Sequence, residues 1–368
     1  MKTNIFVDCH VFDGTMQGTS TYLKGLYKEL IKETDKHFFL TSSNPEKLKA
    51  VFGIHDNITF LKYKSKNKFL RLIFDIPDII KKHKIEYAHF QYIVPPIKRC
   101  KYIVTVHDVL FIDFPEYFPF FNRIKNTFLY RFSANISDII LTVSEYSKEK
   151  IQTHFGIQNI LITTNAVDEA FFESYDKQDI KEKINTEYGL SNYLIYVSRW
   201  EPRKNHHLLL KSFVDLELYK KYQLLFIGDE SLENKKYNDY FQGLEDQIKK
   251  KIVKLEKVDF ETMLLLLRGS EASIYPSIAE GFGIPPLESI AAKIPTISSN
   301  ATAMQDFKLI TPHTFNPLNK TEFEEQLLIL LNTGNQELEQ LKQNLKVKYN
   351  WQNAAKVLND AIDNTKKK

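Results

Sequence analysis

The chain has 368 residues, of which 43% are hydrophobic, and a formal net charge of +4. This length predicts two domains, and the composition excludes a disordered chain. The small net charge gives no indication of a nucleic-acid partner, and two cysteines are too few for a disulfide framework or a cysteine zinc site. Because the sequence shows neither a run of roughly 20 apolar residues nor a signal-peptide pattern, we expect a cytoplasmic location.

Short apolar runs alternate with helical patterns along the chain, which is typical of parallel sheets with crossover helices. One series of such runs ends near residue 143 and a second begins at Tyr193, with the charged segment 175–188 between them as the predicted linker. We therefore expect two doubly wound α/β domains, followed by a C-terminal helix; their predicted bounds are residues 1–175, 190–345 and 346–368. The expected strands are residues 4–8, 37–41, 87–90, 102–106, 139–143, 193–198, 223–227, 273–276 and 296–298, with a helix over 22–32.

The segment 273–300 combines an apolar run, a glycine turn and two acids eight residues apart. Glu280 follows the expected strand, and Glu288 lies in the first turns of a helix expected to begin near Pro286. Glycines such as Gly283 let the backbone approach a ligand closely, and a helix N-terminus favours anions. The alternative is an ordinary connection between a strand and a helix.

Two further strand ends carry candidate functional side chains. Arg199 and Lys204 follow an expected strand and precede a helix, an arrangement that suits a diphosphate, although a solvated basic loop is the alternative. Arg203 is a third cation of this loop, to which the sequence assigns no role. His107 and Asp108 end another expected strand, where His107 is either a substrate-binding or a structural histidine.

The sequence EGFGIPPLE, residues 280–288, resembles the E-x7-E signature of the retaining nucleotide-sugar glycosyltransferases of family four. Residues 193–213 are similar to the phosphate-binding G-R-x-x-x-x-K loop of this family, with Ser198 in place of the usual glycine. His107 and Asp108 match its H-D pair. The resemblance implies the GT-B fold, in which two Rossmann-like domains face each other across a cleft and the C-terminal helix crosses back to the N-terminal domain.

The resemblance also implies an activity: transfer of a hexose, with retention, from a nucleotide-diphosphate sugar to a glycan or lipid-linked glycan in bacterial surface polysaccharide synthesis. GDP-mannose is the favoured donor and UDP-sugars stay open. We expect no metal and no other cofactor. The N-terminal domain is expected to bind the acceptor and the C-terminal domain the donor.

The resemblance assigns roles to individual residues. Glu288 is expected to bind the ribose, Arg199 and Lys204 to neutralise the leaving diphosphate, and Glu280 and His107 to face the sugar.

Four further positions are expected to contact the donor through the backbone. The chain near Phe282 and Gly283 is expected to hold the sugar or phosphate, and Gly228 to line the nucleotide pocket. Gly18 lies where the family has a glycine-rich phosphate loop, although the sequence of residues 13–22 departs from the family pattern there.

Residues 62–84 are basic with interleaved apolar side chains, and residues 114–132 are rich in aromatic side chains. One interpretation is a peripheral contact with the anionic inner face of the cell membrane. The alternative is a solvated basic helix and a normal aromatic core.

Two other functional classes stay open on the sequence alone. One is a catalytically silent subunit that binds nucleotide sugars, which measured sugar transfer would exclude. The other is a nicotinamide-dependent oxidoreductase, which should carry G-x-G-x-x-G after its first strand. The G-F-G-I-P-P sequence at 281–286 breaks that pattern and lies near the other end of the chain.

Overall fold

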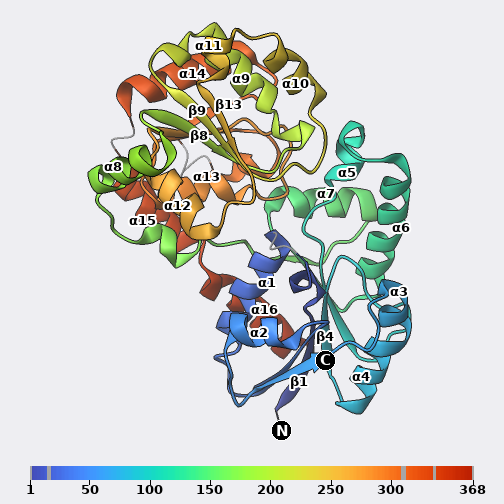
Figure 1. The fold of residues 1–368 in the computed structure, drawn as a ribbon. Coiled ribbons are helices and arrows are strands. Elements are labelled where there is room, and N and C mark those ends of the chain that lie inside the picture. Colours follow the sequence, from blue (N-terminus) through green and yellow to red (C-terminus); the bar gives the residue numbers. More distant parts are fainter. Residues whose placement is uncertain (1, 15–17, 308–311, 335–336, 367–368) are drawn as a thin grey trace. The chain divides into compact units, whose positions relative to one another are not determined.

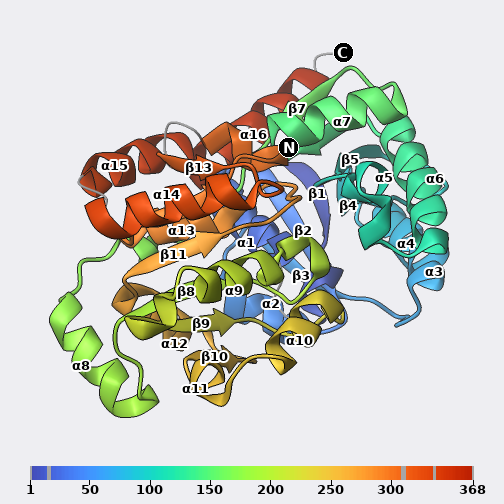
Figure 2. The ribbon, with the colours of Figure 1, turned by 90° about the horizontal axis from the view of Figure 1, so that it is seen from above.

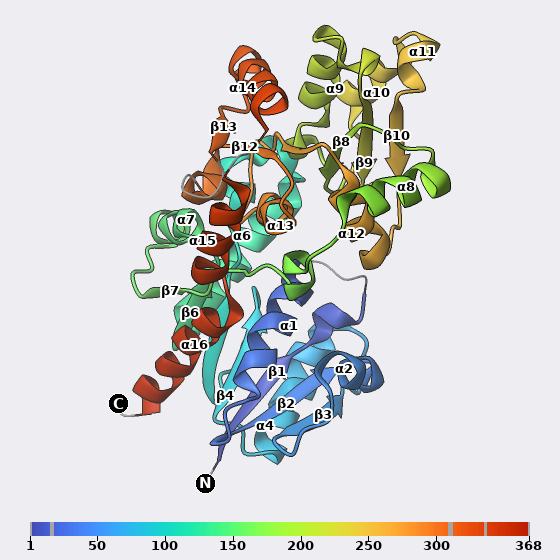
Figure 3. The ribbon, with the colours of Figure 1, turned by 90° about the vertical axis from the view of Figure 1, so that its left-hand side faces the viewer.

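The computed structural model describes residues 2–14, 18–307, 312–334 and 337–366. The chain divides into two compact units, of which the first comprises Met1–Ala166 with Tyr349–Lys368 and the second Val167–Lys348. Each unit is built on one parallel sheet, which confirms the predicted α/β class with two doubly wound domains (Figures 1, 2 and 3).

The sheet of the first unit has the strand order β3-β2-β1-β4-β5-β6-β7, and neighbouring strands are parallel. The strand order reverses between β1 and β4, so the carboxyl ends of these two strands flank the switch point where ligands bind in such sheets. The strands are β1 (Thr3–Asp8), β2 (Lys36–Ser42), β3 (Ile58–Lys62), β4 (Tyr87–Gln91), β5 (Lys101–Thr105), β6 (Ile139–Thr142) and β7 (Ile160–Ile162).

The connections of the first unit are mostly helical. A π-helical turn, Arg71–Asp75, joins α3 to α4. The helices are α1 (Gly18–Leu30), α2 (Pro45–Phe52), α3 (Lys68–Leu70), α4 (Ile76–Lys82), α5 (Leu110–Asp113), α6 (Phe120–Ile136), α7 (Glu145–Phe155) and α16 (Trp351–Lys366).

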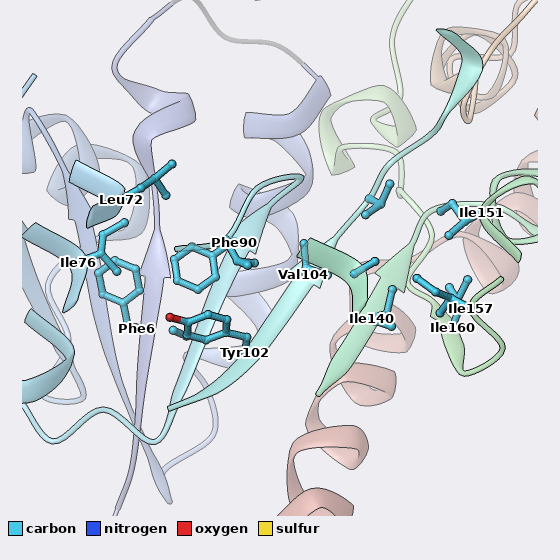
Figure 4. Packing of buried hydrophobic residues seen from close by; sticks show 14 of the residues in the cluster. Phe6, Leu72, Ile76, Phe90, Tyr102, Val104, Ile140, Ile151, Ile157 and Ile160 are labelled. Carbon is cyan, nitrogen blue, oxygen red and sulfur yellow. The ribbon is translucent and has the colours of Figure 1, made fainter. Parts of the chain in front are cut away.

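Aromatic and branched side chains fill the core of the first unit (Figure 4). Phe90 packs between Phe6 and Tyr102, with ring centroids 5.8 and 5.2 Å away. Fully burying a side chain of this kind stabilises the fold by about 1.5–3 kcal/mol. The core therefore fixes the central strands that deliver polar residues to their carboxyl ends.

The C-terminal helix α16 packs against α1 within the first unit (Figure 1). Gly25 makes this contact possible, because a Cβ atom there would lie only 2.0 Å from Cε2 of Trp351. Tyr87 and Lys101 hold the end of the helix by donating hydrogen bonds to the carbonyls of Ile362 and Thr365.

The sheet of the second unit has the order β10-β9-β8-β11-β12-β13, again with parallel neighbours. Its switch point lies between β8 and β11. The strands are β8 (Tyr193–Val197), β9 (Gln223–Ile227), β10 (Ile252–Leu255), β11 (Ala272–Tyr275), β12 (Thr296–Ser299) and β13 (His313–Phe315). The helices are α8 (Lys177–Tyr188), α9 (His206–Asp215), α10 (Lys235–Gln242), α11 (Asp246–Lys249), α12 (Phe260–Gly269), α13 (Ile284–Ala291), α14 (Lys320–Thr333) and α15 (Leu338–Lys348).

The segment 175–188, which we predicted to be the linker, is instead helix α8 of the second unit. Asp176 caps its N-terminus, and Gly189 ends it in the left-handed conformation. The helix packs on α12, where Gly269 leaves room for the buried side chain of Ile184. The linker prediction was wrong because one buried apolar residue is enough to dock a helix that is otherwise charged.

Every strand that the sequence predicts is present, with ends within about two residues of the prediction. Four strands were missed: β3, β7, β10 and β13. Each lies at an edge of its sheet.

Candidate functional site

The candidate site of the second unit lies at the carboxyl ends of the two strands that flank its switch point. The loop after β8 carries Arg199 and Lys204, and the loop after β11 carries Glu280. Helix α13 begins directly after the second loop, at Ile284 rather than near Pro286 as predicted, and no side chain caps it.

Five side chains from these two loops form a continuous set of ion pairs, here called the charge cluster. Glu201 accepts from Arg199 at 3.0 Å and from Arg203 at 2.7 Å. Arg203 also lies 3.1 Å from Glu280, and Nζ of Lys204 lies 2.5 Å from the second oxygen of Glu280. Three cations against two carboxylates give the charge cluster a net positive charge. The Arg199 side chain is 51% exposed, whereas the other four side chains are largely buried.

The charge cluster fixes the ionisation of Glu280. Burial would raise the pKa of this carboxyl, but the charges of Lys204 and Arg203 outweigh burial and lower the pKa to about 2. Burial lowers the pKa of Lys204, and the Glu280 carboxylate opposes that shift. Glu280 is therefore a carboxylate at neutral pH.

Hydrogen bonds to the backbone fix the two loops, and one of them joins the loops to each other. The N–H of Ile278 donates to the carbonyl of Arg203 at 2.7 Å, and the Tyr196 hydroxyl donates to the carbonyl of Lys204 at the same distance. The N–H of Glu280 donates to Oγ1 of Thr302 at 2.8 Å. The charged side chains thus project from a fixed backbone, as electrostatic stabilisation of a ligand requires.

Gly283 and Phe282 shape the turn before α13. Gly283 has φ +88°, and a Cβ atom there would lie 2.7 Å from Cγ of Met304. The Phe282 side chain is buried and packs edge-on against Phe307, at 5.5 Å between ring centroids. The Phe282 side chain anchors the turn from inside, so any contact with a ligand would come from its backbone.

Glu288 lies on α13, and its carboxyl group has no hydrogen bond or ion pair within the described residues. Burial, and then the charge of Asp168, raise the pKa of Glu288 to about 7. Leaving a half-buried carboxyl group without a hydrogen-bond donor lowers the stability of the fold. The hydroxyl groups of a ligand would supply the missing donors.

Gly228 follows β9 and has φ +147°. A Cβ atom there would lie 2.1 Å from the carbonyl oxygen of Ser198. Glycine is thus required for the close approach of this turn to the loop that carries Arg199. The Ser198 hydroxyl, which stands where the family has glycine, lies 3.1 Å from Nε2 of His206.

His107 lies in the first unit, two residues beyond β5, and is buried. Its Nε2 lies 2.7 Å from Oε1 of Gln91 at the end of β4. An amide oxygen only accepts, so Nε2 carries the proton and Nδ1 keeps a lone pair for another donor. Burial lowers the pKa of His107 to about 3, so the ring is neutral.

Hydrogen bonds between buried side chains support His107. Gln91 Nε2 lies 3.4 Å from Nε2 of His89, which lies 2.8 Å from the Thr105 hydroxyl. The Tyr27 hydroxyl lies 2.8 Å from Nδ1 of His89. No pattern in the sequence indicates this network.

Gly18 is the first residue of α1 and is exposed, and a Cβ atom there would meet no other atom within 4 Å. Residues 15–17 of the predicted phosphate loop lie outside the described residues. The structure thus brings Glu280, Lys204 and Gly283 together with Arg199 in the second unit, whereas His107 and Gly18 belong to the first.

Glu201 was not predicted from the sequence, and Arg203 had no predicted role. In the sequence R-W-E-P-R-K the acid Glu201 lies between Arg199 and Arg203, which indicates paired charges. The partner on the other loop, Glu280, is brought to them only by the fold. Within the described ranges, no three His, Cys, Asp or Glu side chains are grouped so that they could hold a metal ion.

Comparisons with known proteins agree with this architecture. The family model "Glycosyl transferases group 1" matches residues 176–348, and "Glycosyltransferase Family 4" matches residues 16–171. The O-antigen chain mannosyltransferase RfbU of Salmonella typhimurium (strain LT2) is 27% identical over 207 residues, which cover 54% of this chain and 51% of the relative. The chain spans about half the length of the first curated relatives that it matches.

Solved structures share the fold across the whole chain. Sucrose-phosphate synthase from Thermosynechococcus elongatus has a TM-score of 0.77 at 12% identity, covering 99% of both chains. HepE from Anabaena, in complex with UDP, has a TM-score of 0.72 at 14% identity, covering 99% of this chain and 100% of the other.

Two doubly wound parallel sheets of this kind define the GT-B class, as predicted. Within that class, residues 176–348 belong to the group 1 glycosyltransferases and residues 16–171 to the glycosyltransferases of family 4.

Proposed function

We propose that this protein is a glycosyltransferase that moves a hexose, with mannose favoured, from a nucleotide-diphosphate sugar to a glycan or lipid-linked glycan. The charge cluster at the switch point of the second sheet carries the proposal, because it combines net positive charge with a fixed backbone beside the uncapped N-terminus of α13. The similarity to an O-antigen mannosyltransferase favours mannose and polysaccharide synthesis.

The donor binds in the second unit in this proposal. The ribose hydroxyls donate to the Glu288 carboxylate, which otherwise lacks donors within the described residues. The diphosphate lies against Arg199, the most exposed cation of the charge cluster, and against Lys204. These charges stabilise the diphosphate as it gains negative charge on leaving.

The proposed reaction joins an acceptor hydroxyl oxygen to the anomeric carbon and breaks the bond from that carbon to the diphosphate. The proton of the hydroxyl passes to the released diphosphate. A general base works best with a pKa near neutral pH, whereas the pKa of Glu280 is lowered to about 2. We therefore assign Glu280 to positioning of the sugar rather than to proton transfer.

His107 offers a lone pair on Nδ1 at the carboxyl edge of the first sheet. We assign it to binding of a substrate hydroxyl group. Retention of the anomeric configuration and independence of metal ions complete the proposal. Arginine and lysine supply the positive charge that a metal ion provides in other sites.

The experiment is a transfer assay with GDP-mannose and UDP-hexoses, in excess chelator, with product stereochemistry determined by NMR. The proposal expects transfer to persist in chelator and the product to keep the donor configuration. Activity that is lost in chelator and restored by a divalent ion would contradict metal independence. Binding of donor without any transfer would favour the silent subunit.

A further inference from the structure

Arg71 is a buried cation that has no acceptor among the described residues. It is 6% exposed, lies in the π-helical turn after α3, and stacks on Tyr63 with its guanidinium 4.9 Å from the ring centroid. Its Nε is buried without a hydrogen-bond partner, and the guanidinium forms no ion pair with any described residue. A buried charge is normally paired, so this arginine lacks an anion.

The carboxylate on which the charge of Arg71 acts is already engaged. Asp8, at the carboxyl end of β1, accepts from the Tyr63 hydroxyl at 2.6 Å, and Nδ1 of His10 lies 3.0 Å away. Burial would raise the pKa of Asp8, but His10, Arg71 and the Tyr63 hydrogen bond hold it well below its usual range. Asp8 thus attracts the Arg71 guanidinium by its charge but accepts no hydrogen bond from it. Asp8 ends β1, which flanks the switch point of the first sheet, where ligands bind in folds of this kind.

Lys68 lies close enough to both Arg71 and Lys125 for their charges to act on it. Partial desolvation, and then the positive charge of Arg71, lower the pKa of Lys68; Asp8 opposes this shift and the charge of Lys125 adds to it. Lys68 comes from α3 and Lys125 from α6, which lie side by side in Figures 1 and 2. Positive charges held this close repel one another unless an anion lies between them.

Exposed apolar side chains lie on the same three elements as these cations. On α3 and the π-helical turn they reach 68% exposure at Phe69, and on α6 they reach 83% at Phe121. A hollow of about 660 Å³ between α5 and α6 continues this surface. The apolar residues are Phe69, Leu70, Ile73, Phe74, Phe120, Phe121, Ile124 and Phe128. Exposed apolar patches of this kind mark binding sites.

We propose that Arg71, Lys68 and Lys125 bind the diphosphate of a lipid-linked acceptor, and that the apolar side chains of α3, the π-helical turn and α6 contact its hydrocarbon chain. A nucleotide or a free glycan leaves the apolar surface unexplained. A diffuse anionic surface does not require a desolvated guanidinium in a fixed position. The ligand is therefore an amphiphile with a phosphate head, recognised one molecule at a time.

The identity of this ligand as the acceptor rests on the proposed function, whereas the binding site itself does not. Within the described residues, no helix is long and apolar enough to cross a membrane.

The test is flotation of the full chain with phosphatidylcholine vesicles, which are neutral, after one of three lipids is added. The added lipid is a polyisoprenyl diphosphate, a polyisoprenol, or phosphatidylglycerol. The phosphatidylglycerol vesicles are matched in surface charge to the diphosphate vesicles. We expect binding to the diphosphate to be at least about tenfold stronger than to the other two, and inorganic diphosphate to compete. Lys68→Ala, Lys125→Ala and Arg71→Gln should each weaken it roughly tenfold, as the loss of one charge-assisted hydrogen bond predicts. Lys82→Ala on α4, an exposed lysine with the same charge change, is the matched control.

The two lysine variants alter exposed side chains, so they test the site even if Arg71→Gln disturbs folding. Equal binding to phosphatidylglycerol and to the diphosphate, or equal binding by Lys82→Ala and Lys68→Ala, would overturn the inference. Titration of GDP-mannose into the same samples reports on the second unit. If the wild type binds GDP-mannose but not the diphosphate lipid, only the inference is overturned. If it binds the diphosphate lipid but not GDP-mannose, only the proposed function is overturned.

Discussion

Arg203 holds Glu280 from two sides, donating to its carboxylate at 3.1 Å and to the carbonyl of the preceding Ala279 at 2.6 Å. It also binds Glu201, so one guanidinium connects both loops of the candidate site. Together with Lys204, whose charge has the larger effect, Arg203 keeps Glu280 ionised although it is buried.

The first prediction concerns the stability that Arg203 contributes. Arg203→Ala leaves two largely buried carboxylates short of a partner, which should lower the free energy of unfolding by about 2–4 kcal/mol. Arg199→Ala removes a half-exposed partner and should cost less than about 1 kcal/mol. Urea unfolding measures both. Equal losses would show that Arg203 does not organise the site.

The second prediction concerns Glu288 and pH. Its folded-state pKa is raised from 4.5 to about 7, so the folded state binds the proton more tightly than the unfolded state. The wild type should therefore lose stability relative to Glu288→Gln as pH rises from about 4.5 to 7, by up to ~3 kcal/mol. Unfolding of both proteins across this range provides the measurement. A difference that is constant with pH would contradict the raised pKa.

Glu280 should show the opposite pH dependence. Its folded-state pKa is lowered to about 2, so its stabilising contribution is complete above about pH 4.5 and is lost as pH falls towards 2. Glu280→Gln should therefore be less stable than the wild type at neutral pH, with the gap closing in acid. A gap that widens in acid would argue against the ion pairs with Lys204 and Arg203.

The third prediction separates glycines that the fold needs from one that it does not. Gly228→Ala places a Cβ against the Ser198 carbonyl, a backbone contact that cannot yield, and should cost several kcal/mol. Gly283→Ala meets the flexible Met304 side chain and should cost about 1–2 kcal/mol, mainly for its positive φ. Gly18→Ala should leave the melting temperature unchanged. Weaker donor binding by that variant would reveal a ligand role for Gly18, whereas a large loss of stability would contradict the exposed position.

The fourth prediction concerns the tautomer of His107. The hydrogen bond to Gln91 should keep the proton on Nε2, and burial should keep the ring neutral down to about pH 4, because its pKa is lowered to about 3. Nitrogen-15 NMR of the histidine ring reports both properties. In Gln91→Leu the preference for Nε2–H should weaken. Protonation of His107 near pH 6.5 in the wild type would contradict the buried network.

Much of the fold could be predicted from the sequence because central strands are buried on both faces and therefore form continuous apolar runs. The missed strands are edge strands with mixed burial. β3 and β10 are only partly buried along their length, and β7 and β13 have three residues each. An edge strand is held by backbone hydrogen bonds to a single neighbouring strand. Backbone hydrogen bonds do not depend on the side chains, so the hydrophobic pattern of the sequence does not indicate such a strand.

The candidate site was predictable where a function depends on residues close in sequence, such as Glu280 and Glu288. It was not predictable where the partners come from separate loops or strands. Arg203 meets Glu280 only because β8 and β11 are neighbours, and Gln91 reaches His107 only because β4 and β5 are. Contacts of this kind follow from strand order, which no local pattern specifies.

Donor binding through Glu288 is best tested by titration calorimetry of GDP-mannose and UDP-glucose into the wild type and Glu288→Ala. Both phosphates of these donors stay ionised between pH 6 and 8, so a change of wild-type affinity over that range reports on the Glu288 carboxyl. We predict that the wild type binds one donor, more tightly at pH 8 than at pH 6, and that Glu288→Ala binds it roughly 10- to 100-fold more weakly at pH 8. Glu187→Ala, an exposed change on α8, should bind like the wild type. Equal donor affinity in the wild type and Glu288→Ala would contradict a donor site built on Glu288.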